Sequence, residues 1–291
     1  MRLSVIIPCF NAARTLSCQL EAFAAQEWDG EWEVIVVDNL STDDTQRVAR
    51  KHSGKLPRLR IVEAEAKRGR AYARNFGARV ASGEALAFCD ADDQVAPGWL
   101  AAIGAALKRG DLAASRFDVT KLNPVWLQSV HRNPQETGLQ RMRFFPYLFH
   151  AGGSGLGVKR KWHERLGGFN ETLPVLEDAE YCFRAQILGA RICYAESAVV
   201  HVRYRAGWLT LFNQARLWAV YNVLIYKRYG LCNGHRVPRA WRNYLDDWRR
   251  FLWRLRRARD RASFAECVWR AGWQVGLLQG SIAFGSAPVS L

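Results

Sequence analysis

The chain has 291 residues, of which 49% are hydrophobic, and its formal net charge is +15. This composition excludes a disordered chain and provides apolar material for one large domain, or for one domain with an appendage. The positive charge is uneven, because residues 203–270 hold 16 Lys or Arg against four Asp or Glu.

The seven cysteines are scattered and include no Cys-x-x-Cys pair. An odd number of thiols, several of them inside apolar runs, is typical of a reducing compartment. The apolar run at residues 3–7 is too short for a signal peptide, and neither 217–226 nor 271–291 has the roughly 20 continuous apolar residues of a membrane span. We therefore expect a cytoplasmic protein.

The first 120 residues alternate between short apolar runs and amphipathic segments. Asn11 is expected to cap the helix after the first strand, and Ser41 with Asp44 has the pattern of a capping box before the next helix. This alternation predicts an α/β fold with a doubly wound, mostly parallel sheet flanked by helices. The expected strands cover residues 3–7, 33–37, 59–62, 85–89 and 112–119, and two further helices cover 70–81 and 97–109.

Residues 120–140 lose this periodicity and contain two Asn-Pro pairs, which predicts an irregular surface segment. A glycine-rich run at 152–157 then leads into a strand of small residues. Short helices are expected at 162–166 and 177–188, strands at 191–194 and 198–201, and Trp- and Arg-rich helices at 208–228 and 238–273. We therefore expect an α/β domain at 1–206 and a basic, aromatic helical extension at 207–291.

Three carboxylates stand within four positions at the end of one expected strand: Asp90, Asp92 and Asp93. In open α/β sheets, ligands bind at the carboxyl edge of the strands. Carboxylate oxygens suit hard divalent cations such as Mg²⁺ or Mn²⁺, which proteins often bind together with nucleotide phosphates. Asp is also common in turns, so the pattern taken alone favours a simple strand-to-turn junction.

Five blocks of sequence, taken together, resemble the family 2 glycosyltransferases of the GT-A fold. The resemblance covers roughly residues 2–202, and the order and spacing of the blocks carry it. Asn39 and Leu40 depart from the family's usual two Asp followed by Gly, which leaves the nucleotide base open. The blocks are Ser4 to Asn11, Val36 to Thr45, Gly69-x-x-x-Ala73-Arg74-Asn75, Cys89 to Asp93, and Gly167-Gly168-Phe169 followed by Glu177-Asp178.

The resemblance implies a nucleotide-sugar site with a divalent metal. Asp90 and Asp92 would hold Mn²⁺ or Mg²⁺, with His201 as a further ligand, and the metal would stabilise the charge on the departing diphosphate. Asp178 would be the general base that takes the proton of the attacking hydroxyl. The residues implied for donor binding are Pro8, Phe10, Asn11, Asp38 (on the base), Arg74 (toward the diphosphate), Asp90 and Ala91.

Several of these assignments have a purely structural alternative. The helix dipole favours an acid at the position of Asp178, Asn11 can be only a helix cap, and a lone histidine such as His201 is more often structural. Because the resemblance outweighs these alternatives for Asp178, the leading function is inverting transfer of a sugar from a UDP-sugar to a hydroxyl of a glycan or lipid-linked acceptor.

Two other functions remain open. A sugar nucleotidyltransferase also uses a nucleotide, a metal and acidic side chains, although Pro8-Cys9-Phe10-Asn11 stands where those enzymes have a Gly-rich, Arg-containing loop. The non-enzymatic alternative is a basic membrane- or nucleic-acid-binding protein with a degenerate transferase core.

The basic tail interleaves Trp and Phe with arginines between Trp241 and Arg261. This composition is typical of a helix that lies in an anionic membrane surface. The alternatives are a helix packed on the domain with its arginines in water, and a nucleic-acid site, for which no recognised motif is present. We therefore expect a peripheral protein at the inner face of the plasma membrane, without a nucleic-acid partner.

Overall fold

The structure is a computed structural model that describes residues 1–56, 58–130, 133–234 and 236–289. The chain forms two compact units. The expected boundary between residues 206 and 207 lies three residues after the last segment of the second unit begins, and two shorter segments of that unit lie within the expected first domain. Unit 1 comprises Met1–Leu122, Pro134–Gln140 and Phe149–Arg203, and unit 2 comprises Asn123–Asn133, Arg141–Leu148 and Tyr204–Leu291.

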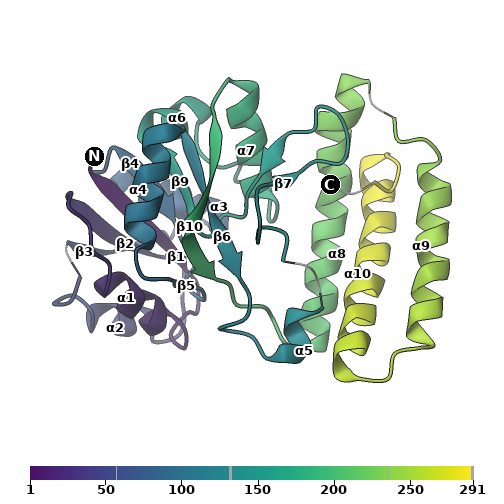
Figure 1. The fold of residues 1–291 in the computed structure, drawn as a ribbon, viewed down its shortest axis with the longest axis horizontal. Coiled ribbons are helices and arrows are strands. Elements are labelled where there is room, and N and C mark those ends of the chain that lie inside the picture. The colour runs from purple at the N-terminus through teal and green to yellow at the C-terminus, as the bar shows by residue number, and fades with distance from the viewer. Residues whose placement is uncertain (57, 131–132, 235, 290–291) are drawn as a thin grey trace. The chain divides into compact units, whose positions relative to one another are not determined.

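Unit 1 is built on an eight-stranded sheet with the order β3-β2-β1-β4-β9-β6-β10-β5 (Figure 1). Four neighbouring strand pairs are parallel and three are antiparallel, and β9 runs antiparallel between β4 and β6. The predicted α/β fold with a mostly parallel sheet is therefore confirmed. The strands are β1 (Leu3–Cys9), β2 (Trp32–Asp38), β3 (Leu59–Glu63), β4 (Ala85–Phe88), β5 (Gln94–Val95), β6 (Leu112–Asp118), β9 (Leu156–Lys159) and β10 (Ile192–His201), and β7 (Gln140–Arg141) and β8 (Phe149–His150) form a separate two-stranded sheet.

Helices cover both faces of the large sheet, which explains the continuous β-branched runs in its central strands. Alternate residues of β1 belong to different cores: Val5 and Ile7 pack with α1, α2 and α4, whereas Ile6 packs with α3, α6 and α7. The helices of unit 1 are α1 (Leu16–Ala24), α2 (Thr45–Arg50), α3 (Arg70–Val80), α4 (Trp99–Arg109), α6 (Arg160–Leu166) and α7 (Glu177–Ile187).

Two predicted helix caps are wrong. The first helix begins at Leu16, not after Asn11, because Asn11 lies in the left-handed region (φ 50°). Ser41 and Asp44 form no capping box before α2, since Asp44 makes no side-chain cap hydrogen bond. The hydroxyl of Ser41 instead accepts a hydrogen bond from the backbone N–H of Asn11 (3.0 Å), so these residues join the loops after β1 and β2.

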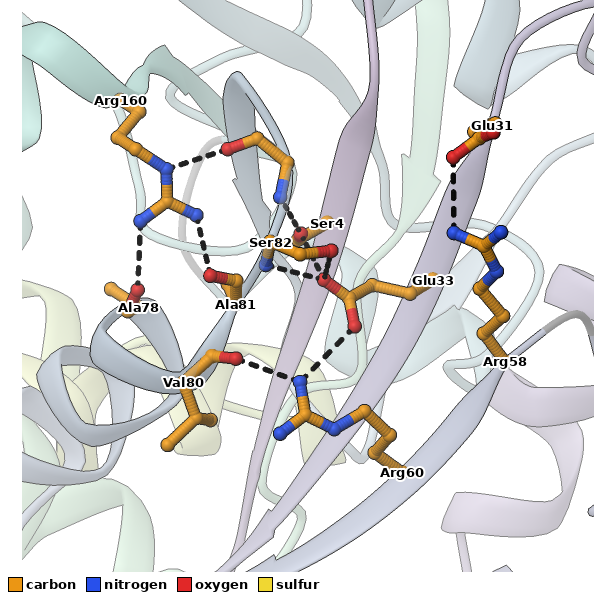
Figure 2. A network of polar contacts seen from close by, with 11 residues as sticks. Ser4, Glu31, Glu33, Arg58, Arg60, Ala78, Val80, Ala81, Ser82 and Arg160 are labelled. Carbon is orange, nitrogen blue, oxygen red and sulfur yellow. Dashed lines mark hydrogen bonds and ion pairs between the residues drawn. The ribbon is translucent and has the colours of Figure 1, made fainter.

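A buried carboxylate secures the amino-terminal edge of the sheet (Figure 2). Glu33 on β2 accepts hydrogen bonds from the hydroxyls of Ser4 and Ser82 (both 2.7 Å) and forms an ion pair with Arg60 (3.3 Å). Burial opposes ionisation, but these hydrogen bonds outweigh it and lower the pKa of Glu33. Arg160 donates to the carbonyl oxygens of residues 78, 81 and 83, which ends α3 beside the same network.

His163 on α6 lies in an aromatic cluster with Phe88, Phe169 and Tyr181. Burial lowers the pKa of His163 to about 4, so the folded protein keeps the ring neutral. An unfolded chain protonates this ring near pH 6.5, so the stability that the neutral ring contributes is complete above pH 6.5 and is lost as the pH falls toward 4.

We therefore expect the stability advantage of the wild type over His163→Gln to shrink by about 3 kcal/mol between pH 7 and pH 4. Urea unfolding of both proteins at several pH values measures this difference. A difference that stays constant with pH would contradict the assignment.

Unit 2 is helical, with α8 and α10 packed against each other and α9 packed against α10 (Figure 1). The single helix expected at 238–273 is wrong, because the chain turns after Leu255 and a capping box of Asp260 and Ser263 starts a new helix. The elements are α5 (Val125–Gln128), α8 (Trp208–Ile225), a π-helical turn (Tyr226–Gly230), a 3₁₀ turn (Leu231–Asn233), α9 (Ala240–Leu255) and α10 (Arg261–Phe284).

Three glycines at intervals of four residues let α10 approach α8 closely. A Cβ atom on Gly272, Gly276 or Gly280 would collide with backbone carbonyl oxygens of α8. Larger residues at these positions would therefore force the two helices apart. None of the described helices combines the length and the apolar character that crossing a bilayer requires.

Candidate active site

The carboxyl edge of the sheet in unit 1 collects most of the candidate side chains. Asp38 ends β2 beside Cys9 of β1, and Asp90 follows β4 by two residues. On the other side of β9, Asp118 and His201 end β6 and β10 as register partners. Four strands therefore deliver polar residues to one edge, as the predicted sheet requires.

Asp90, Asp92 and Asp93 form one acidic cluster, in which an oxygen from each lies within 4.8 Å of the others. Asp92 is exposed, whereas Asp93 is buried and accepts a hydrogen bond from the backbone N–H of Arg203 (2.9 Å). Burial and the charges of Asp92 and Asp90 raise the pKa of Asp93 well above its usual range. The cluster thus concentrates negative charge at the sheet edge.

Arg74 on α3 lies behind this cluster and joins it to α7. Its side chain is 0% exposed, with Nη2 2.7 Å from Asp90 Oδ1 and Nη1 2.9 Å from Glu177 Oε1. Gly153 makes room for the guanidinium, because a Cβ there would collide with it. Arg74 is thus enclosed between Asp90 and Glu177, and its expected contact with the diphosphate stays a prediction.

Arg70, one turn earlier on α3, approaches the same carboxylates from the solvent side. Its side chain is 45% exposed and its Nη1 lies 3.9 Å from Glu177 Oε1. The carboxylate of Asp90, together with those of Glu177, Asp178 and Asp92, raises the pKa of Arg70. Arg70 is therefore the accessible cation of this pair of arginines.

Asp178 lies in the first turn of α7 and is held by two backbone N–H groups. Its Oδ2 accepts from Gly153 (2.7 Å) and its Oδ1 from Ala179 (2.8 Å). The next residue of the glycine-rich loop, Ser154, accepts a hydrogen bond from the backbone N–H of Asp90 (3.2 Å). One loop before β9 therefore contacts both the acidic cluster and the candidate base.

His201 ends β10, which is a single strand and not the two expected, with a register shift between Ala195 and Val199. Its Nδ1 lies 2.5 Å from Asp118 Oδ2, which leaves Nε2 for another partner. Burial opposes ionisation of Asp118, but hydrogen bonds from Thr120 and His201 outweigh it and lower the pKa of Asp118 to about 2. A carboxylate on Nδ1 is the usual arrangement behind a histidine that binds a metal through Nε2.

The residues expected to bind the nucleotide lie around the ends of β1 and β2. Asp38 is buried, and its two oxygens accept hydrogen bonds from the N–H of Ser41 (3.1 Å) and from Gln46 Nε2 (2.7 Å). Phe10 is 39% exposed, and the guanidinium of Arg68 lies 3.6 Å from its ring centroid. Pro8 is partly exposed on β1, Asn11 is exposed, and Ala91 is buried within the acidic loop.

Asn39, which departs from the family pattern, has an internal structural role. Its side chain is buried, and Nδ2 donates to the carbonyl oxygens of Ala64 (2.5 Å) and Lys67 (2.8 Å) while Oδ1 accepts from the N–H of Gly69 (2.8 Å). Only an amide can donate and accept in this way. Asn39 therefore holds the loop that carries Arg68.

We expect Asn39→Asp to destabilise the protein by about 3 kcal/mol. The carboxylate oxygen that replaces Nδ2 cannot donate, so it would face the carbonyl oxygens of Ala64 and Lys67 without a hydrogen bond. Asn11→Asp is the matched control, since Asn11 Oδ1 only accepts, from the N–H and hydroxyl of Thr42, and a carboxylate preserves both hydrogen bonds. Chemical unfolding of both variants measures the difference. Equal losses of stability would show that Asn39 does not hold this loop.

Several residues that build the site have no individual role in the sequence prediction: Glu177, Asp118, Gly153 and Ser154. The signal for Asp118 was present, because it also ends a strand of the sheet. The glycine-rich run at 152–157 is visible in the sequence, but its contacts with Asp90 and Asp178 depend on the fold. Asn75 is another such case, since its side chain binds both the N–H and the carbonyl of Phe169 and so joins two of the five blocks.

Comparison with known proteins places these features in a family. The family model described as "Glycosyl transferase family 2" matches residues 4–167, and the one described as "Glycosyl transferase family group 2" matches residues 87–264.

Two curated relatives come from Escherichia coli. The uncharacterized glycosyltransferase YibD of strain K12 is 34% identical over 125 residues, which are 43% of this chain and 34% of YibD. The second, UDP-Glc:alpha-D-GlcNAc-diphosphoundecaprenol beta-1,3-glucosyltransferase WfgD, is 34% identical over 90 residues, which are 31% of this chain and 34% of WfgD. The match thus spans about a third of the length of each.

Two solved structures share the fold. Staphylococcus aureus TarS 1–349 in complex with UDP-GlcNAc has a TM-score of 0.57 at 19% identity, over 98% of this chain and 93% of TarS 1–349. The mannosyltransferase PcManGT from Pyrobaculum calidifontis, in complex with GDP-Man and Mn²⁺, has a TM-score of 0.57 at 21% identity, over 98% of this chain and 72% of PcManGT.

Proposed function

This chain belongs to glycosyl transferase family 2, and we propose that it transfers a sugar from a nucleotide-diphosphate donor to a hydroxyl group of its acceptor, with inversion at the anomeric carbon. One observation carries the proposal: the acidic cluster and Asp178 are contacted by the same loop and joined through Arg74 and Glu177. A cation-binding group and a proton acceptor are thus built into one site.

The acidic cluster has the donor chemistry of a divalent metal site. Asp90, Asp92 and Asp93 offer one carboxylate oxygen each within a 4.8 Å span. His201 is not part of that group, and we propose it as a further ligand because Asp118 occupies its Nδ1 and leaves Nε2. Carboxylates suit Mg²⁺ and Mn²⁺, and an imidazole ligand favours Mn²⁺ of the two. When bound, such an ion would neutralise charge on the leaving diphosphate.

The residues of the chain divide the remaining work. The carboxylate of Asp178 accepts the proton of the acceptor hydroxyl. At the same time, the oxygen of that hydroxyl bonds to the anomeric carbon of the sugar, and the bond between the anomeric carbon and the diphosphate oxygen breaks. The two backbone hydrogen bonds on Asp178 hold it in place before the substrate arrives. Arg70, whose side chain is 45% exposed beside the same carboxylates, is the arginine that we propose for contact with the diphosphate of the donor.

We propose a UDP-sugar as the donor and a glycan or a lipid-linked sugar as the acceptor. Asp38, Phe10 and the stacked Arg68 offer a carboxylate, a ring and a planar cation for a base and ribose. TarS binds UDP-GlcNAc, and WfgD is named for a UDP-sugar donor and a diphosphoundecaprenol-linked acceptor, which supports both choices. A lipid-linked acceptor would also give a reason for a peripheral position at the inner face of the plasma membrane.

The direct test is a thermal-stability screen of nucleotide sugars with and without Mn²⁺. A donor present at 100 times its Kd should stabilise the protein by about 2.7 kcal/mol, with only one nucleotide base effective. Asp92→Ala should remove the part that depends on Mn²⁺. If no nucleotide sugar stabilises the protein, the chain has no donor site and the proposal is wrong. Release of pyrophosphate from a nucleoside triphosphate and a sugar phosphate would instead identify a nucleotidyltransferase.

A further inference from the structure

Helix α9 is held to unit 2 by one side only. Tyr244 is buried and its hydroxyl donates to the carbonyl oxygen of Gln274 on α10 (3.2 Å). Trp248, one turn further, packs on the same apolar cluster as Leu277. The inner face of the helix is therefore accounted for by packing within the unit.

The outer face, which begins beside this packed side, carries an apolar stripe of half-exposed residues, and Trp241 also contacts the packed side, with its ring centroid 6.0 Å from that of Tyr244. Trp241, Leu245 and Leu252 are 50%, 56% and 53% exposed. Their spacing of four and seven residues places them on one line along the helix. Large apolar side chains in such a row are costly to leave in water and mark an interaction surface.

A row of arginines borders this stripe. Arg242, Arg249 and Arg256 recur every seven residues, so they share a face of the helix directly beside the apolar line. Arg249 pairs with Asp246, but its side chain is 80% exposed. In the part of the chain that the structure describes, no carboxylate lies within ion-pair distance of Arg242 or Arg256.

The apolar line and the arginine row together select among the surfaces that could cover α9. A phosphate-rich polymer such as nucleic acid would use the arginines but not the leucines. A second copy pairing through the same face would bring two arginine rows together. An anionic bilayer satisfies both features, because acyl chains take the apolar stripe and lipid phosphates take the guanidinium groups.

We propose that the outer face of α9 is a binding surface for anionic membranes, with Trp241, Leu245 and Leu252 at the acyl boundary and the arginine row on the lipid phosphates. This inference rests on the proposed function, because a lipid-linked acceptor gives the membrane surface its purpose. Binding of the membrane itself requires neither a nucleotide-sugar donor nor a metal ion.

The test is co-sedimentation of the full chain with vesicles of phosphatidylcholine alone or mixed with phosphatidylglycerol. We expect binding only to the mixed vesicles. Replacing Arg242, Arg249 and Arg256 together with Gln should weaken it about 100-fold, because each basic residue near an anionic surface contributes about a factor of five. Replacing Trp241, Leu245 and Leu252 with Gln should weaken binding to a similar extent and remove the quenching of tryptophan fluorescence by brominated lipid.

A matched control removes three charges from exposed residues of unit 1: Arg50→Gln, Lys108→Gln and Arg109→Gln. This variant should keep the affinity of the wild type within about twofold, since its charges lie outside the proposed surface. Three results would each overturn the inference. The first is equal binding to both vesicle types, and the second is a loss of binding in the control as large as in the arginine variant. The third is tight binding of nucleic acid that the substitutions of Trp241, Leu245 and Leu252 leave unchanged.

The same proteins should be carried through the nucleotide-sugar stability screen. All of the α9 variants should bind the donor as the wild type does, because none of the substituted residues belongs to the donor site. Vesicle binding without donor binding would remove the proposed function and leave the membrane surface, and the reverse result would remove only the membrane surface.

Discussion

Replacing Asp178 with Asn should lower the rate of sugar transfer by about 10²- to 10⁴-fold, the range that a positioned general base contributes. An amide cannot accept the proton of the attacking hydroxyl. Donor binding should persist, because the acidic cluster and Asp38 are unchanged. The amide has one acceptor oxygen for the two N–H groups of Gly153 and Ala179, so we also expect a loss of about 1 kcal/mol in stability.

Single-turnover transfer and the thermal stability of the donor complex, measured on the same protein, separate these effects. Glu164→Gln is the control, because Glu164 is exposed on α6 and its only described ion pair is a long one with Arg160 (3.9 Å). It should match the wild type in both assays. Unchanged transfer by the Asp178 variant would assign the base to another residue.

Arg74→Met should destabilise unit 1 by about 3–5 kcal/mol, because it leaves the buried Glu177 without its closest cation. Burial and the neighbouring Asp178 already raise the pKa of Glu177. Loss of Arg74 should also release Asp90, so that Mn²⁺-dependent donor binding weakens even in molecules that remain folded. Arg74→Lys should recover only part of both properties, since one ammonium cannot span two carboxylates as the guanidinium does.

A double-mutant cycle with Glu177→Gln isolates the pair. The double variant should be more stable than the sum of the single losses predicts, by about 2 kcal/mol. Arg60→Met provides the control, because that arginine is 43% exposed beside Glu33 and its removal should cost about 1 kcal/mol or less. Additive losses at Arg74 and Glu177 would show that they act independently.

The architecture of unit 1 follows from local patterns in the sequence. The β-branched runs identified the strands, and their alternation with helices predicted the parallel sheet. Once the sheet is known, the edge rule places Asp38, Asp90 and His201 along the same edge, because all three end or follow its strands. The resemblance to a family then supplied roles that no local pattern contains, above all for Asp178.

The contacts that hold the site could not be predicted in this way. Arg74 and Glu177 are 103 residues apart, and Asp118 and His201 are 83 residues apart. In neither pair does the sequence around one residue specify its partner, because the pairing depends on how the strands and helices are arranged in the fold. The break between α9 and α10 was missed for a related reason: residues 256–259 are Arg and Ala, which favour helix, and no glycine or proline marks the turn.

The place of β9 in the sheet has a consequence for synthesis of the chain. Strands β4 and β6 are complete by residue 118, but the strand that lies between them begins at Leu156. A ribosome-bound chain that has emerged only to residue 150 therefore lacks one sheet partner of β4 and both partners of β6, and unpaired strand edges are a known route to aggregation. Gly153 and Ser154 lie just before β9, so the loop that contacts Asp90 is synthesised with the strand that fills the gap, whereas Asp178 and His201 follow only later in the chain.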